Sequence, residues 1–511
     1  MYDGQEELDS LVWDKNDEDS DKSLKRMRLK ATCRAVERLA EQCLGTPATL
    51  VPPLVAGGFN MLYKVHLAGD PPRPDVMVRL PCPSLVQFPD EKTVQEAATA
   101  RYIAENTQIP IPQHFSCGRD PTIGPFVILQ YIPESRGSMS ARLTTPNDDP
   151  SVTHVLNPDI DEATLEDIWG KAAACLIRLS RLTFPRIGAL VEVEGEGNVA
   201  GSYSIAGRPI THNLTDMVRL ANVPRAVLPP EGKTYSTADE WYVALAEMHL
   251  AQLVFQHNDA VESADDCRNK FVARQIFRRL AKQDRLSSFG FAEDSWSAQS
   301  SKMSSSSLSP APPGSGAFRL WGDDLRAGNM LLRDTDELVA AIDWEFAYAA
   351  PTQFVLDPPW WLLLDLAETW SSGIDDWLRI YELRLKTWLA AMKRAEGSIP
   401  GVDQRDALPA PLSTYMRESW ETGRFWLSYG ARKSWAFDMA YWMFLDERFF
   451  GERGDVLKED LWKTRVHLLT DEERAAMEPF VESKMRESED RVIVDWDPVG
   501  ARKRLSEVLF D

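Results

Sequence analysis

The feature that most constrains the fold is a predicted β-hairpin with polar, chemically capable side chains at both of its ends. Short apolar runs at residues 330–332 and 338–342 are separated by an aspartate-rich turn. Asp324 and Asn329 come before the first run, and Asp343 comes directly after the second. Because a hairpin folds its two ends back to one edge, the side chains of Asn329 and Asp343 are expected to lie close together.

The order of these side chains fits phosphoryl transfer. An aspartate, four intervening residues, an asparagine, a hairpin and a second aspartate supply the groups that this reaction needs. Asp324 would accept or orient the proton of an attacking hydroxyl, while Asn329 and Asp343 would hold Mg²⁺ ions that bridge phosphate oxygens. The structural alternative is a helix-capping aspartate, an asparagine in a turn and an aspartate in an ordinary β-turn.

The composition is that of an ordinary globular protein. The chain has 511 residues, enough for two or three lobes, with 44% hydrophobic and 26% charged residues. Its net charge of -21 argues against nucleic-acid binding, which needs a basic surface. That charge could also attract cationic substrates, although solubility is the simpler explanation.

Several features predict a cytoplasmic location. No apolar run approaches the roughly 20 residues that span a bilayer, so a membrane partner is not expected. The acidic stretch between Asp3 and Asp21 is the opposite of a basic targeting segment. The six cysteines are scattered and contain no CxxC pair, which is typical of buried thiols in a reducing compartment.

The sequence up to residue 134 predicts a leading segment and a small α+β lobe. Residues 1–45 are expected to form a solvated acidic arm, up to about residue 22, and then a helix. Residues 46–134 are expected to form the small lobe. Strand-like runs between residues 50 and 80 precede a helix over Glu91–Asn106 and a strand over Phe126–Tyr131, a β-β-β-α-β order.

Residues 135–511 predict a larger, mostly helical lobe for catalysis and substrate binding. Helical periodicity runs over Leu165–Leu182, Ala238–His257 and Val261–Gln283. Periodicity is lost near residues 284–316, where much of the stretch is Ser, Pro, Gly and Ala, so we expect a disordered insertion there. The expected fold class is α+β, with a small antiparallel β-sheet lobe and a large helical lobe.

The segment around Asp324 resembles a known motif. Trp321-Gly-Asp-Asp-Leu-Arg-Ala-Gly-Asn329 and Ala341-Ile-Asp-Trp-Glu-Phe346 are similar to two motifs of the aminoglycoside phosphotransferase and choline kinase superfamily, which includes fungal-type phosphotransferases. Those motifs are His-Gly-Asp-x4-Asn and Ile-Asp-Trp-Glu. The resemblance implies a bilobal protein-kinase-like fold. It also implies a catalytic role for Asp324 and metal-binding roles for Asn329 and Asp343.

The resemblance has one departure, beside the catalytic position. Where the family has His-Gly, the chain has Gly322-Asp323. The family's histidine braces the loop, so its replacement concerns the rigidity of the loop more than the chemistry. Asp323 is an alternative base, but five residues separate it from Asn329, whereas four separate Asp324 from Asn329. The spacing favours Asp324, and we expect Asp323 to brace the loop.

Residues 55–65 look like the nucleotide loop of that family, which is a strand, a glycine turn and a strand. The nucleotide-binding residues implied there are Gly57, Gly58, Phe59 and Asn60. Glycine lets backbone N–H groups approach phosphates because it has no Cβ. The structural alternative is that the Gly-Gly turn is only a hairpin.

Further nucleotide contacts are implied for the rest of the small lobe. Arg79 stands where the family has the lysine that pairs the α- and β-phosphates, and it differs from lysine in reach and geometry. Glu96 stands where a helix supplies the acid that holds that cation, so we expect an ion pair; the alternative is a solvated helix face. Residues 126–132 resemble the linker whose backbone reads the adenine edge, here Gln130 and Ile132, although a core strand fits equally well.

The residues expected around the phosphate acceptor carry a weaker signal. Asp357, Asp365, Trp370, Asp375 and Asp376 fall where the family builds its acceptor pocket. Acidic groups beside tryptophans would suit an amine or a quaternary ammonium, through charge and cation–π attraction. Tryptophans at helical spacing are, however, more often part of the core.

The resemblance implies an ATP- and Mg²⁺-dependent kinase that phosphorylates a hydroxyl of a small molecule. The alternative is a catalytically weak pseudokinase that acts as a binding module, which Arg79 and the absent loop histidine favour. The intact set of Asp324, Asn329 and Asp343 argues against that alternative. A protein kinase is disfavoured because no Asp-Phe-Gly or Ala-Pro-Glu signature occurs. The sequence leaves the acceptor and the oligomeric state open.

Overall fold

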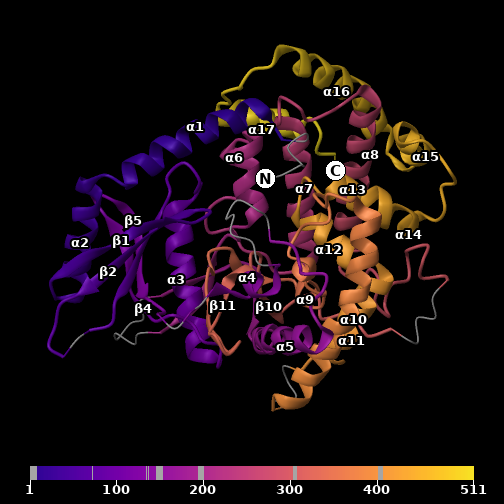
Figure 1. Ribbon diagram of the computed structural model, residues 1–511. Coiled ribbons are helices and arrows are strands. Elements are labelled where there is room, and N and C mark those ends of the chain that lie inside the picture. Colours follow the sequence, from indigo (N-terminus) through magenta and orange to yellow (C-terminus); the bar gives the residue numbers. More distant parts are fainter. Residues whose placement is uncertain are drawn as a thin grey trace.

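The computed structural model describes residues 8–71, 73–133, 135, 137–145, 154–193, 201–302, 308–400 and 407–510. Figure 1 shows a sheet-containing lobe built from the N-terminal part of the chain and a larger helical lobe built from the rest. This two-lobed α+β architecture is the fold class that the sequence predicted. Among the described residues, no helix combines the length and the apolar character needed to cross a membrane.

The small lobe is built on a five-stranded antiparallel sheet with the strand order β1-β2-β3-β5-β4. Its strands are β1 (Ala48–Ala56), β2 (Asn60–Leu67), β3 (Val76–Pro81), β4 (His114–Asp120) and β5 (Gly124–Gln130), and α3 (Pro89–Asn106) connects β3 to β4. On β2 the alternate residues Met61, Tyr63 and Val65 are fully buried, because one face of the sheet packs into the apolar core of this lobe. The predicted order of elements is confirmed, except that β4 was missed.

Two helices precede the sheet, α1 (Ser10–Met27) and α2 (Lys30–Leu44). The expectation of a solvated acidic arm is wrong for residues 8 to 22, because they lead into and form α1, which runs from the large lobe to α2 beside the small lobe (Figure 1). Asp9 is buried and accepts hydrogen bonds from the Asn258 side chain at 3.0 Å. Most acidic side chains of α1 are exposed, which explains why composition alone indicated an arm. Residues 1–7 lie outside the described residues.

The large lobe is mostly helical and holds the main apolar core. Its longer helices are α5 (Glu162–Leu179), α6 (His212–Ala221), α7 (Ala238–Phe255), α8 (Ala264–Lys282), α10 (Ile374–Ser398), α11 (Leu412–Thr422), α12 (Arg424–Arg432), α16 (Asp471–Asp490) and α17 (Pro498–Ser506). Its shorter helices are α4 (Met139–Leu143), α9 (Thr352–Val355), α13 (Phe437–Met439), α14 (Asp446–Phe450) and α15 (Leu461–Arg465). The three helices that the sequence predicted in this lobe correspond to α5, α7 and α8.

Small sheets within the large lobe place the predicted hairpin. The strands are β6 (Gly137–Ser138), β7 (Thr183–Phe184), β8 (Ala189–Glu192), β9 (Tyr203–Gly207), β10 (Phe318–Gly322), β11 (Met330–Leu332), β12 (Leu338–Ala341) and β13 (Ala347–Ala350). β11 and β12 form the hairpin, which confirms that prediction, and β10 pairs with β13. The loop after β10 and the segment after β12 therefore lie side by side. Two backbone hydrogen bonds join them, from Asp323 to Phe346 at 3.1 Å and from Ile342 to Asn329 at 2.9 Å.

The segment near residues 284–316 differs from the expectation of a disordered insertion. Its described parts pack against the large lobe, and Phe289 and Phe291 are buried. The Phe289 ring lies 4.8 Å from the ring of Phe449, and the Ser309 hydroxyl donates to Glu418 at 3.0 Å. These anchors follow neither a helical nor a strand period, so the sequence pattern did not reveal them. Residues 303–307 lie outside the described residues.

Candidate active site

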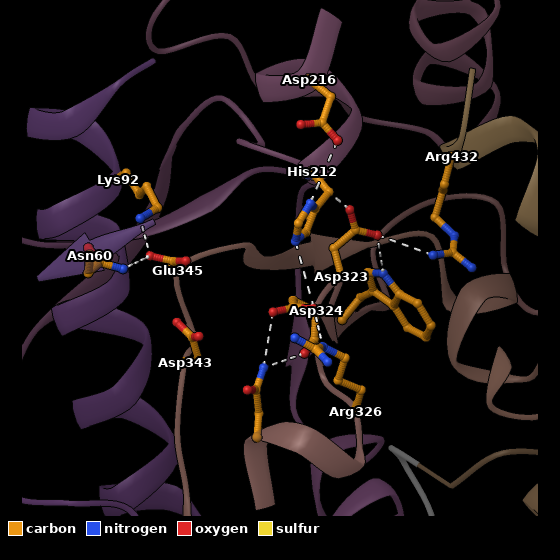
Figure 2. A network of polar contacts seen from close by, with 12 residues as sticks. Asn60, Lys92, His212, Asp216, Asp323, Asp324, Arg326, Asp343, Glu345 and Arg432 are labelled. Carbon is orange, nitrogen blue, oxygen red and sulfur yellow. Dashed lines mark hydrogen bonds and ion pairs between the residues drawn. The ribbon is translucent and has the colours of Figure 1, made fainter. Parts of the chain in front are cut away.

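The loop between β10 and β11 carries Asp324 (Figure 2), which lies beside Asn329. Asn329 ends a short 3₁₀ helix, Ala327–Asn329, and donates its side-chain N–H groups to the Asp324 carbonyl at 2.8 Å and to Asp324 Oδ2 at 3.1 Å. Arg326 Nε donates to Asp324 Oδ1 at 2.9 Å. The amide nitrogen of Asn329 is thus turned to Asp324, and its amide oxygen is the atom that could bind a cation.

Asp343 follows β12 in a left-handed backbone conformation, with a φ of 69°. Residues other than glycine rarely adopt this conformation, although aspartate is among those that tolerate it. The Asp343 carboxylate contacts the small lobe, where Arg79 Nη2 of β3 donates to Asp343 Oδ1 at 2.5 Å. Unusual backbone conformations of this kind often occur at functional sites, and this one belongs to a carboxylate that joins the two lobes.

Arg79 connects the small lobe to three carboxylates. Its Nη1 donates to Glu96 Oε1 at 2.5 Å, which confirms the ion pair predicted between the strand and the helix. Its Nη2 donates to Asp343 and also, at 2.8 Å, to Glu345 Oε2. Burial alone disfavours the guanidinium cation, but Asp343, Glu96 and Glu345 outweigh burial and raise the Arg79 pKa. Side chains of the protein therefore engage both terminal nitrogens.

Glu345 and Lys92 also belong to this cluster, and neither was among the residues predicted from the sequence. Glu345 is buried, and its Oε2 accepts from Lys92 Nζ and, at 2.9 Å, from Asn60 Nδ2 (Figure 2). Asn60 thereby ties the glycine turn to the large lobe, and its nucleotide-binding role stays a prediction. The sequence does contain a signal for Glu345, because this residue is the glutamate of the Ile-Asp-Trp-Glu motif that also contains Asp343. Lys92 stands four residues before Glu96 and carries no local signal.

The charges around Asp343 fit a divalent cation. Two cations, Arg79 and Lys92, face the three carboxylates of Glu96, Asp343 and Glu345. Burial raises the pKa of Asp343, and it raises the pKa of Glu96 to about 7, in both cases against the attraction of Arg79. A cation with oxygen ligands would offset this excess of buried negative charge. Within the described residues, no three His, Cys, Asp or Glu side chains are arranged to hold a metal ion, so ligand oxygens would have to complete its coordination.

Asp323 faces the interior of the large lobe. Its Oδ1 accepts from Arg432 Nη1 at 3.1 Å and from Trp321 Nε1 at 3.1 Å, and its Oδ2 accepts from the His212 backbone N–H at 3.2 Å. Asp323 and Arg432 are both buried. Asp323 thus has partners that differ from those of Asp324 (Figure 2), but they are side chains and the backbone of α6 rather than the backbone of the loop, and its role as a brace stays a prediction. Arg432 lies 109 residues away in the sequence, and no motif pointed to it.

His212, the first residue of α6, lies against Asp324. Its Nε2 is 3.7 Å from Asp324 Oδ1, and its Nδ1 is 3.9 Å from Asp216 Oδ2. Burial alone disfavours the imidazolium, but Asp216 and Asp324 outweigh burial and raise the His212 pKa to about 10. Burial would raise the Asp324 pKa, but His212 and Arg326 lower it to about 2. Asp324 is therefore ionised at neutral pH. No sequence motif pointed to His212 or Asp216.

The glycine turn between β1 and β2 reaches the large lobe. The Gly57 N–H donates to the Asn60 carbonyl at 2.8 Å, which closes the turn. Phe59 packs edge-to-face on His212 and Phe346, with ring centroids 5.3 Å and 5.2 Å away. A Cβ added at Gly58 would meet no described atom within 4 Å, so packing does not require glycine there. The phosphate-binding role of this turn stays a prediction.

The linker after β5 is only partly free to contact a nucleotide base. The Gln130 N–H donates to the Gln113 carbonyl at 2.8 Å, and the Tyr131 N–H donates to the Asp75 carbonyl at 3.3 Å. The N–H group of Gln130 is therefore already engaged. The N–H group of Ile132 forms no backbone hydrogen bond to any residue that the structure describes. Of the two predicted linker residues, Ile132 is thus the better placed for this contact.

Two of the acidic residues expected around an acceptor already bind other parts of the protein. Asp357 is buried and accepts from the Ser419 hydroxyl at 2.5 Å. Asp376 accepts from Trp370 Nε1 at 2.9 Å and from Arg379 Nη2 at 2.7 Å. These contacts favour the structural alternative for both residues over a site for an amine.

No protein-family model matches the sequence, and no curated protein matches it. The solved structures that match include antibiotic phosphotransferases. One is a macrolide 2'-phosphotransferase type I, with 12% identity and a TM-score of 0.36 over 86% of this chain and 98% of that chain. Another is aminoglycoside phosphotransferase APH(4)-Ia with AMP-PNP and hygromycin B, with 11% identity and a TM-score of 0.37 over 89% and 98%. A GDP complex of aminoglycoside 2'-phosphotransferase-IIIa matches with 14% identity and a TM-score of 0.36 over 86% and 99%. These likenesses are distant, so function has to be argued from the residues of the site.

Proposed function

We propose that the protein is an ATP- and Mg²⁺-dependent phosphotransferase whose acceptor is a hydroxyl of a small molecule. The observation that carries the proposal is the contact between Asp324 and Asn329 beside the hairpin that positions Asp343, with Arg79 reaching Asp343 from the small lobe. An ionised aspartate, an amide oxygen and a second carboxylate next to a cation are the groups that phosphoryl transfer uses.

The role of each residue follows from its position. Asp324, ionised and held by Asn329, would orient the acceptor hydroxyl and take its proton as the hydroxyl oxygen bonds to the γ-phosphorus. The bond from that phosphorus to the bridging oxygen breaks, and ADP leaves. Asn329 and Asp343 would hold Mg²⁺, which when bound neutralises charge on the phosphate oxygens. The N–H group of Gly58 would face those phosphates, because the Gly57 N–H already closes the turn on the Asn60 carbonyl.

A second candidate is a pseudokinase that binds a ligand without turnover. The observation that favours it is that both terminal nitrogens of Arg79 already bond to carboxylates of the protein. Lys92 is a further cation beside the glycine turn, with its ammonium 5.5 Å from the Phe59 ring, but it too bonds to Glu345. Binding does not separate the two candidates, whereas turnover does.

A small molecule is the partner that we expect. The net charge of -21 disfavours nucleic acid, whose binding needs a basic surface. The cytoplasmic location and the absence of a membrane partner stay predictions of the sequence.

A transfer assay tests the proposal. The protein is incubated with Mg²⁺, ATP or GTP, and a panel of hydroxylated metabolites and antibiotics, and phosphorylated products are detected by mass spectrometry. Wild-type protein should yield a Mg²⁺-dependent product, and Asp324→Asn should yield none above background. Nucleotide binding without product or phosphate release would select the pseudokinase. Failure to bind either nucleotide would contradict both candidates.

A further inference from the structure

The imidazole of His212 lies between two carboxylates at the edge of the candidate site. Its Nδ1 is 3.9 Å from Asp216 Oδ2 and its Nε2 is 3.7 Å from Asp324 Oδ1 (Figure 2). We propose that His212 is a positioning residue that holds the Asp324 carboxylate for phosphoryl transfer. This role rests on the function proposed above, because it assigns Asp324 a part in the reaction.

The two neighbours define the protonation state of the ring. A neutral imidazole has one N–H group and can donate to one carboxylate only, whereas the imidazolium can donate from both nitrogens. Each ring nitrogen of His212 faces a carboxylate, so the doubly protonated ring fits the geometry. Burial opposes the charge, but Asp216 and Asp324 raise the His212 pKa to about 10. The side chain keeps 35% of its exposure, so water weakens each ion pair.

The backbone of His212 is fixed to the same loop. Its N–H group, at the N-terminus of α6, donates to Asp323 Oδ2 at 3.2 Å. Thr211 caps this helix, since its hydroxyl accepts from the Leu214 N–H at 3.0 Å. One residue therefore contacts both adjacent aspartates, Asp323 through its backbone and Asp324 through its side chain. The loop itself contains no histidine, and α6 supplies one that contacts it.

The same ring also touches the glycine turn. Phe59 lies 5.3 Å from the His212 ring, and Phe346 lies 4.4 Å from it. Arg219 shares a face of α6 with His212 and Asp216, donates to Asp216 at 3.1 Å and lies 5.9 Å from the Phe59 ring. His212 therefore connects the glycine turn to Asp324. A movement of the turn can shift the His212 ring and, with it, the Asp324 carboxylate.

Charged groups of both signs surround His212. They are Asp216 and Arg219 on α6 and Asp323, Asp324 and Arg326 in the loop. Lys92 on α3 lies one ring further away, with its ammonium 5.5 Å from the Phe346 ring that packs on His212. Within the described part of the chain, only Asp216 and Asp324 lie close enough to the ring nitrogens to form ion pairs. A change in the charge of Asp216 or of Asp324 should therefore change the pKa of His212.

An NMR titration of the histidines in the full-length protein tests this geometry without any need for turnover. The chain has seven histidines, and His212→Gln assigns the signal of His212. The His212 pKa should be about 10, well above the ordinary value of 6.5. Asp324→Asn and Asp216→Asn should each lower it, and the second serves if the first does not fold. His66→Gln on β2, which removes a histidine paired with Asp75, should leave it unchanged.

Release of phosphate from Mg·ATP, with water as acceptor, provides the second readout. His212→Gln should lower kcat and leave the KM for ATP close to wild type, and His212→Arg should restore part of kcat because it keeps a cation beside Asp324. A His212 pKa near 6.5 that neither Asp variant moves would overturn the proposal, even in an active enzyme. A pKa of about 10 in a protein without turnover would support the ion pairs and contradict the proposed function instead.

Discussion

Asp323 and Asp324 are neighbours in the sequence, yet their carboxylates bond to different parts of the protein. Asp323 is held by Arg432 and Trp321, whereas Asp324 is held by Asn329 and by Arg326. The first set of contacts anchors the loop to the large lobe, and the second holds an ionised carboxylate in the loop that leads into the β11–β12 hairpin. Their substitutions should therefore have different consequences.

Asp323→Asn should destabilise the fold. Buried Arg432 would lose its carboxylate partner, and an uncompensated buried charge costs about 3–5 kcal/mol. The new amide can still accept from Trp321, so we expect the lower end of that range. Urea unfolding measures the change. Asp19→Asn, which breaks an exposed pair with Lys15 on α1, is the matched control and should leave the midpoint unchanged. Equal midpoints for wild type and Asp323→Asn would mean that Asp323 is no brace.

Gly58→Ala should leave folding intact and weaken binding of Mg·ATP. An added Cβ would meet no described atom within 4 Å, but it would obstruct a phosphate that approaches the turn. In wild type, Mg·ATP at a hundredfold excess over Kd should stabilise the native state by about 2.7 kcal/mol, and the variant should gain less at the same concentration. Thermal unfolding with and without ligand measures both effects.

Gly188→Ala provides the contrast for that experiment. Gly188 has a φ of 158°, and an added Cβ would lie 2.7 Å from the Gly207 carbonyl oxygen. This variant should lose stability without any ligand present. If Mg·ATP stabilises Gly58→Ala as much as it stabilises wild type, the glycine turn does not contact the phosphates.

Arg79→Lys should weaken the contact between the lobes. One ammonium cannot reproduce a guanidinium that bonds Glu96 through one nitrogen and Asp343 and Glu345 through the other. We expect a loss of about 1–3 kcal/mol in the free energy of unfolding, because a buried acceptor would lose its donor, together with altered turnover. Lys64→Arg on β2, at a partly exposed pair with Asp75, is the control. Unchanged stability and turnover in Arg79→Lys would show that neither folding nor activity needs the two donor nitrogens of the guanidinium.

The contact between His212 and Asp324 should stabilise the fold within a defined pH window. The Asp324 pKa is lowered from 3.8 to about 2, so its contribution is present above about pH 4 and is lost as pH falls through about 2. The His212 pKa is raised from 6.5 to about 10, so its contribution is complete below pH 6.5 and is lost as pH rises through about 10. The difference in unfolding free energy between wild type and His212→Gln should be largest between about pH 4 and 6.5. A difference that stays constant up to pH 10 would contradict the ion pair.

The features that the sequence predicted correctly depend on residues that are close along the chain. The hairpin, and with it the placement of Asp343, follows from two short apolar runs and a turn. The contact of Asp324 with Asn329 follows from their spacing. The ion pair of Arg79 with Glu96 joins a strand to the next helix, across only 17 residues.

The partners that the sequence did not reveal come from distant elements. Arg432 meets Asp323 across 109 residues, His212 meets Asp323 across 111, and Lys92 meets Glu345 across 253. Each contact depends on how α12, α6 and α3 pack. In the sequence, no local pattern distinguishes Arg432, His212 and Lys92 from basic residues that are exposed to solvent. The stretch near residues 284–316 was misjudged for a related reason, since isolated aromatic anchors such as Phe289 hold it in place without a periodic pattern.

Turnover of Mg·ATP by Asp324→Asn, with nucleotide binding measured in parallel, tests most directly whether Asp324 is the base. Removal of a positioned general base should lower phosphoryl transfer to water or to an identified acceptor by about 10²–10⁴-fold. The affinity for Mg·ATP should stay close to wild type, because the nucleotide contacts that we propose are made by other residues. Asp323→Asn, assayed where it remains folded, should show a milder loss. An Asp324→Asn protein that turns over ATP like wild type, above all beside an inactive Asp323→Asn, would contradict the assignment.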